Sequence, residues 1–142
     1  CDIIYATKMT KIGDPHVSVG LVAGDGGAVI WPQLIGYPRA KEYLMTGDLL
    51  SADHAADIGL INYAVSEDQL DDVVYGMAER LAGGAINAIK WTKASINTGL
   101  KQVANSVLDT AFNFEAMSQM TQDHKIATEA FLAKRKPKFT GR

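Results

Sequence analysis

The sequence predicts an α/β chain whose few short strands come first and whose second half consists of helices. Residues 2–6 and 60–65 are short runs rich in β-branched and aromatic side chains, as in buried strands. From residue 68 onward, apolar residues recur every three or four positions, as on one face of a helix. This change of pattern divides the chain into residues 1–66 and 67–142.

Prolines and glycines are expected to divide residues 28–47 into short helices. Pro32 lies inside a helical pattern at residues 28–35, so two short helical pieces are expected there, because proline is tolerated only in the first turn of a helix. A further helix over residues 38–46 should end at Gly47.

A short helix is predicted next. Ser51 has the side chain of an N-cap, so a helix should start after it, run through Ile58 and end at Gly59.

Four consecutive helices are predicted in the second half. The first covers residues 68–82, with an apolar stripe made of Leu70, Val73, Val74, Met77, Ala78 and Leu81. A second helix should end at Gly99 and a longer third helix should follow. The last should begin with Asp123 as its cap and end near Pro137. Because these helices have more apolar surface than they can hide from one another, a sheet or another subunit must cover the surplus.

Composition excludes several classes of protein. The 142 residues are 47% hydrophobic and 21% charged, with a net charge of −2, so neither nucleic acid nor an anionic membrane is an expected partner. The single Cys1 allows no intrachain disulfide, and no apolar run approaches the ~20 residues of a membrane-spanning helix. The chain opens on strand-like residues without Met, so we expect part of a longer protein.

The glycine cluster from Gly20 to Gly27 is the most conspicuous motif. It lacks the Lys-Ser/Thr pair of a phosphate loop, and Val29 stands where a dinucleotide fingerprint has its third glycine. The remaining interpretation is a tight turn that opens a helix, whose free N–H groups favour negative charge. On spacing alone, a plain turn is the better interpretation.

Individual side chains leave two interpretations open. His16 is either an acid–base group or a histidine satisfied locally, and Asp25 is either a base or a helix cap. Together with Asp14 they match no standard spacing of metal ligands, so no metal is expected. Trp31 and Trp91 are predicted core residues.

Three separated motifs follow one another along the chain. The first is Cys1-Asp-Ile-Ile-Tyr-Ala followed by Asp14-Pro-His-Val-Ser-Val-Gly-Leu-Val-Ala-Gly-Asp-Gly-Gly27. The second is Tyr43-Leu-Met-Thr-Gly47 with Gly59-Leu-Ile-Asn62, and the third is Ala130-Phe-Leu-Ala-Lys-Arg-Lys-Pro-Lys-Phe-Thr-Gly141. Together they resemble the enoyl-CoA hydratase/isomerase (crotonase) family, in the C-terminal half of its chain, and their order and the lack of a large gap make the resemblance specific.

The resemblance implies the end of a crotonase-like ββα spiral in residues 1–66 and a C-terminal helical trimerisation region in residues 67–142. It implies an enzyme of acyl-CoA thioesters, most simply one that adds water to a 2-enoyl-CoA through an enolate held in an oxyanion hole. Both oxyanion N–H groups and one catalytic carboxylate would precede Cys1, so these 142 residues alone should be inactive. An isomerase, another crotonase-family reaction, or a non-catalytic binding or assembly protein are the alternatives.

The same resemblance implies the site. His16 stands where a hydratase has its second acid, which follows Pro15, and Asp25 is a candidate for the missing carboxylate. The substrate and its CoA group would contact Pro15, Val19, Leu21, Gly24, Phe131 and Lys134. CoA is part of the substrate, so no separate cofactor is expected. The family also implies a homotrimer or a dimer of trimers in the cytoplasm or the mitochondrial matrix.

Overall fold

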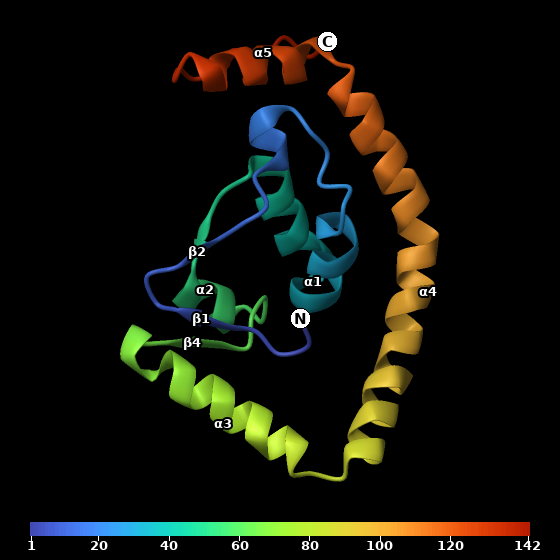
Figure 1. The fold of residues 1–142 in the computed structure, drawn as a ribbon. Helices are drawn as coiled ribbons and strands as arrows, with labels where there is room; N and C mark the ends of the chain where they lie inside the picture. Colours follow the sequence, from blue (N-terminus) through green and yellow to red (C-terminus); the bar gives the residue numbers. More distant parts are fainter. The chain divides into compact units, whose positions relative to one another are not determined.

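The computed structural model describes residues 1–142 (Figure 1). They form two compact units. One unit contains Cys1–Ile12 and Leu50–Asn105, and the other contains Gly13–Leu49 and Ser106–Arg142. Both units are therefore assembled from segments that are distant in the sequence. The division at residue 66 follows the family's architecture instead and stays a prediction.

The strands of the first unit are short and form two pairs. β1 (Tyr5–Thr7) pairs in parallel with β4 (Tyr63–Val65), and the rings of Tyr5 and Tyr63 stack with centroids 4.9 Å apart. β2 (Lys11–Ile12) pairs antiparallel with β3 (Leu50–Ser51). The strands predicted at residues 2–6 and 60–65 exist, but both are shorter than expected.

The first strand is also less buried than the sequence suggested, because all three residues of β1 are only partly covered. Just before this strand, the N–H of Ile4 donates to the side chain of Asn62 at 2.8 Å, while the carbonyl of Ile4 accepts the backbone N–H groups of Asn62 and Tyr63 at 3.0 and 3.2 Å. A side-chain amide thus takes the place of one backbone acceptor at the start of the pair.

Helix α2 (Ala52–Asp57) confirms the predicted cap. The Ser51 Oγ accepts the N–H of His54 at 3.2 Å, which satisfies one free donor of the first turn. Gly59 follows the end of the helix at φ 83°, a left-handed conformation that glycine adopts without steric cost.

In the second unit, helix α1 (Gly27–Thr46) is broken at Gly36 (φ 78°, ψ 159°), which lies between the helices predicted at residues 28–35 and 38–46. The further split predicted at Pro32 is wrong, because Pro32 lies within the helical run. Gly36 is the residue that adopts a positive φ without steric cost, so the chain turns there, and Pro38 then falls in the first turn of the next segment. Gly47 ends α1 as predicted, with its N–H 2.8 Å from the oxygen of Tyr43.

The remaining helices number three and not four. α3 (Leu70–Ala82) follows a single 3₁₀ turn, and α4 (Ile86–Gln119) continues without a break through Gly99. A glycine inside a helix costs only about 1 kcal/mol, which does not end a helix of this length. Trp91, predicted in the core, is 70% exposed on α4.

Helix α5 (Gln122–Leu132) is capped by Thr121 and not by Asp123. The Thr121 Oγ1 accepts the N–H of His124 at 3.2 Å. The Asp123 carboxylate accepts instead from the backbone N–H groups of Thr140 and Gly141, at 2.7 and 2.9 Å, so it holds the end of the chain. No helix of this protein combines the length and hydropathy that crossing a membrane would require.

Candidate active site

The residues before the glycine cluster form a tight turn that places His16. Pro15 precedes a 3₁₀ turn at His16–Val19, and Gly20 (φ 70°) ends this turn in a left-handed conformation. The N–H of Leu21 then donates to the oxygen of His16 at 2.9 Å. The backbone around His16 is therefore closed on itself, which limits the movement of the imidazole.

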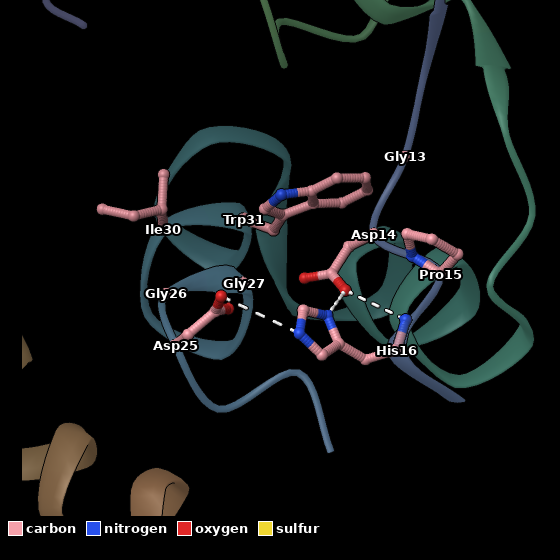
Figure 2. Close-up of a pocket in the computed structure, with 9 residues that line it drawn as sticks. All are labelled: Gly13, Asp14, Pro15, His16, Asp25, Gly26, Gly27, Ile30 and Trp31. Atoms are coloured by element: carbon pink, nitrogen blue, oxygen red, sulfur yellow. Dashed lines mark hydrogen bonds and ion pairs between the residues drawn. The ribbon is translucent and has the colours of Figure 1, made fainter. Parts of the chain in front are cut away.

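The imidazole of His16 lies between two carboxylates (Figure 2). Its Nδ1 hydrogen-bonds the Oδ1 of Asp14, and its Nε2 lies 3.8 Å from the Oδ2 of Asp25. The side chains of Asp14 and His16 are 11% and 25% exposed, whereas that of Asp25 is 60% exposed. The tight partner is thus the sheltered carboxylate, and the loose partner is the one open to solvent.

Two glycines at the start of α1 permit this arrangement, Gly26 by its backbone conformation and Gly27 by the space it leaves. Gly26 adopts φ 153° and ψ −26°, a conformation that a residue with a Cβ rarely adopts. A Cβ on Gly27 would overlap the Oδ2 of Asp14. The carboxylate therefore rests against the beginning of α1, where the helix dipole favours negative charge.

A cavity of about 370 Å³ opens beside these side chains. Pro15, His16, Asp25, Ile30 and Trp31 are among the residues that line it, and Figure 2 shows the indole near the imidazole. The Trp31 ring also lies 6.3 Å from that of Tyr43, so this tryptophan is both packed and part of the cavity wall. The cavity therefore combines apolar walls with convergent polar groups, as ligand sites commonly do.

Electrostatics favour the protonated imidazole. The hydrogen bond to Asp14 raises the pKa of His16 above its ordinary value of 6.5, against an opposing effect of burial, and the charges of Asp14, Asp25 and Glu115 raise it further. An imidazole is a side chain that can accept and donate protons, and here the charged form is the one that its neighbours stabilise.

The same three side chains offer a weak metal site at best. Ligand atoms of Asp14, His16 and Asp25 lie within 4.8 Å of one another, although their sequence spacing matched no standard site. However, one oxygen of Asp14 already accepts from Nδ1, and the three side chains fall short of the four ligands that zinc usually takes.

Several other predicted site residues lie outside this cavity. Val19 ends the 3₁₀ turn, and its carbonyl accepts from Nδ1 of His124 at 2.8 Å, while Leu21 follows Gly20. Gly24 is buried against α4, where an added Cβ would lie 2.5 Å from the oxygen of Ala111. These positions belong to the loop that precedes α1 and are not among the residues that line the cavity.

Phe131 and Lys134 belong to the same unit and lie at the end of α5. The ring of Phe131 is 76% exposed, and Lys134 follows the helix with φ 52°, a left-handed conformation that is uncommon for a residue other than glycine. The structure thus leaves an aromatic face and a cation accessible there.

Sequence reasoning missed the partner of His16. It treated Asp14 only as a poor metal ligand, although a carboxylate two residues before a histidine, with a proline between them, was the available signal. It also missed two residues of α4, Glu115 and Ser118. The Oγ of Ser118 accepts the N–H of Val22 at 3.2 Å, 96 residues away, and no local pattern predicts such a contact.

Comparison with known proteins identifies the family. The family model described as enoyl-CoA hydratase/isomerase matches residues 1–142, so the chain belongs to this family. A relative from Syntrophomonas wolfei, named crotonyl-CoA hydratase, is 36% identical over 143 residues, which cover 98% of this chain and 54% of the relative. A short-chain-enoyl-CoA hydratase of Clostridioides difficile is 34% identical and is matched over 92% of this chain and 84% of its own length.

Solved structures agree on the fold. An enoyl-CoA hydratase/isomerase from Pseudoalteromonas atlantica superimposes with a TM-score of 0.88 at 27% identity, over 99% of this chain and 56% of that one. The expected crotonase-like α/β fold is therefore confirmed. The chain spans about half the length of most of these relatives. Its placement in a C-terminal half is not supported by the family match, which covers residues 1–142 without marking one half.

Proposed function

We propose that this chain supplies an acid–base group of an enoyl-CoA hydratase, an enzyme that adds water to the double bond of a 2-enoyl-CoA. The observation that carries the proposal is His16, held between Asp14 and Asp25 beside a cavity, at the position where the family resemblance expects the second acid. Two hydratases among the relatives, at 36% and 34% identity, support the reaction class.

The geometry suits activation of a water molecule. Nε2 and the Asp25 Oδ2 are 3.8 Å apart, so one water can lie about 2.8 Å from both atoms. As the water oxygen bonds to C3 of the enoyl group, one water proton passes to Nε2 and the electrons of the double bond move toward the thioester. The resulting enolate takes a proton at C2 from the second acid–base group of the enzyme, which completes the addition.

The oxyanion hole that stabilises the enolate is not assigned to residues of this chain. By the resemblance it lies in sequence before Cys1, and one carboxylate of the hydratase pair lies there as well.

The CoA group provides a second part of the proposal. Phe131 offers an exposed aromatic face and Lys134 a cation, a combination suited to adenine and phosphate. Pro15 lines the cavity, while Val19, Leu21 and Gly24 would act through the backbone of the loop. The protein would work without a separate cofactor, as a homotrimer or a dimer of trimers, in the cytoplasm or the mitochondrial matrix.

Isomerisation is the second candidate, because the family includes isomerases and a single histidine can carry a proton from C4 to C2. A non-catalytic binding or assembly role is the remaining alternative. The histidine between carboxylates favours catalysis over it, because a purely structural turn does not need a raised imidazole pKa beside a cavity.

The test uses the intact enzyme that contains these residues, assayed for hydration of crotonyl-CoA and for isomerisation of a 3-enoyl-CoA. His16→Ala and Asp25→Asn should each lower kcat/KM for hydration, with His16→Ala reducing it by about 10²-fold or more. His54→Ala, on α2, is the matched control and should keep full activity. Unchanged kcat/KM in both site variants would remove these residues from the mechanism, and loss of isomerisation alone would favour the second candidate.

A further inference from the structure

We propose that Asp14 is the positioning residue of this site, which fixes the tautomer and the orientation of the His16 ring so that Nε2 is the atom that exchanges protons with the substrate. The inference rests on the proposed function, because it assigns a role to the group behind the acid–base histidine. Neither the family resemblance nor the sequence pattern assigned Asp14 such a role.

The first argument is the chemistry of the hydrogen bond. An ionised carboxylate only accepts hydrogen bonds, so the Nδ1 that faces Asp14 must carry the proton. In the neutral ring the other nitrogen, Nε2, then has a free lone pair, and that nitrogen points toward Asp25 and the cavity (Figure 2). The tautomer with a proton on Nε2 could not accept one from water.

The second argument is that the carboxylate is held in place. Its side chain is only 11% exposed, and Pro15, whose ring fixes one backbone dihedral, separates it from His16. Because Gly27 has no Cβ, the Oδ2 of Asp14 can lie against the start of α1, a helix that runs from Gly27 to Thr46. A carboxylate restrained on these sides holds the ring with little loss of freedom when substrate binds.

The third argument excludes a merely local role as a helix cap. Asp14 lies next to the N-cap of the 3₁₀ turn, Pro15, but no side chain caps this turn. The distance from the Asp14 Oδ1 to the backbone nitrogen of His16 is 3.4 Å, long for a hydrogen bond, whereas the same oxygen bonds the ring tightly. The carboxylate is therefore directed at the imidazole.

The arrangement is the one in which a carboxylate orients a catalytic histidine through Nδ1 while Nε2 does the proton transfer. In such sites a change of the carboxylate to an amide preserves the shape but disturbs the tautomer. It follows that Asp14→Asn should reduce kcat strongly while substrate affinity changes little.

The experiment is a mutant cycle in the intact enzyme, with Asp14→Asn, His16→Ala and the double variant, and with Asp48→Asn as the matched control on an exposed aspartate. We expect Asp14→Asn to lower kcat by about 10²-fold, to leave KM within about twofold, and to have no further effect when His16 is already Ala. Nitrogen NMR of ¹⁵N-histidine-labelled enzyme should show the neutral His16 ring protonated on Nδ1 in the wild type, with a lower pKa in Asp14→Asn. His16→Ala identifies the signals of His16 among those of the other histidines.

The outcomes separate the two levels of the proposal. If Asp14→Asn alters the NMR signals of His16 but leaves kcat intact, the positioning role is wrong while the proposed function stands. An equal loss of kcat from Asp14→Asn in the His16→Ala background would also overturn it, because the effect would be structural. If His16→Ala itself retains full activity, the proposed function fails.

A variant that fails to fold does not end the test. Gly27→Ala keeps the charge of Asp14 but places a methyl group where its Oδ2 lies, so the carboxylate must shift. This variant should show a partial loss of kcat together with the same change in the His16 signals. A Gly27→Ala enzyme with displaced His16 signals and normal kcat would contradict the proposal.

Discussion

The substitution Gly24→Ala tests how the glycine loop lies on helix α4. An added methyl carbon would be 2.5 Å from the backbone oxygen of Ala111, 2.7 Å from the Oε2 of Glu115 and 2.8 Å from its Cβ. The carboxylate can rotate away, but the carbonyl and the Cβ belong to a continuous helix and cannot move without bending it. The loop must therefore lift from α4.

The magnitude follows from the cost of overpacking a close contact, about 1–3 kcal/mol, with about 2 kcal/mol as the central expectation. For a chain of this size or somewhat larger, 1 kcal/mol corresponds to a shift of about 2–4 °C in the melting temperature. We therefore expect Gly24→Ala to melt about 4–8 °C below the wild type.

The assay is thermal unfolding of the intact enzyme, and Gly99→Ala is the matched control. Gly99 lies inside α4, and a Cβ there would meet nothing within 4 Å. The same added methyl should stabilise the helix by roughly 0.5–1 kcal/mol, because alanine loses less backbone freedom than glycine. If Gly24→Ala melts at or above the wild-type temperature while Gly99→Ala melts higher, the close packing of the loop on α4 is refuted.

Three further predictions concern the tail and the imidazole. Lys134→Ala should raise KM for acyl-CoA with little change in kcat, and Lys136→Ala should leave both unchanged; equal effects of the two would indicate only the general charge of the tail. Asp123→Ala should release residues 140–142, because the Asp123 carboxylate accepts the N–H of Thr140, and the Thr140 amide should then exchange its hydrogen faster; unaltered exchange would show that this hydrogen bond does not hold the end of the chain. The pKa of His16 is higher in the folded protein than in the unfolded chain, where it is about 6.5. Protonation of His16 therefore contributes its full stabilisation below the unfolded pKa, and this stabilisation is lost as pH rises through the folded pKa. The difference in unfolding free energy between wild type and His16→Ala should accordingly shrink with rising pH, and a constant difference would refute the ion pair.

The stability contributed by the hydrogen bonds from Thr140 and Gly141 to Asp123 has the opposite pH dependence. Hydrogen bonds from Thr140 and Gly141 lower the pKa of Asp123 below its ordinary value of 3.8. Its contribution is therefore present above the unfolded pKa and is lost as pH falls through the folded one, so the tail should stay attached at neutral pH and detach only in acid.

Local signals predicted a large part of the secondary structure. The cap at Ser51, the stop at Gly47 and the helix over residues 70–82 were all found, because each depends on residues within a few positions of one another. The errors share a different feature. The helix boundary at Gly99 and the kink at Pro32 were assigned from propensity alone, and neither propensity was strong enough to decide the outcome.

The candidate site was predicted less completely. His16 and Asp25 were chosen by resemblance and by residue type, and the structure places them 3.8 Å apart beside one cavity. The role of Asp14 was not foreseen, although it lies only two residues from His16. Hydrogen bonding between near neighbours depends on the turn they form, and the turn here depends on Gly27 leaving space for the carboxylate.

The sequence by itself determined the family and the class of fold, because three motifs in fixed order carry information over the whole chain. Only the tertiary structure shows which carboxylate lies beside each ring nitrogen of His16, and that Asp123 binds Thr140 near the end of the chain. These contacts depend on how turns and helices distant in sequence meet, which is set by packing and by the space that side chains leave, and no single segment of the sequence contains that information.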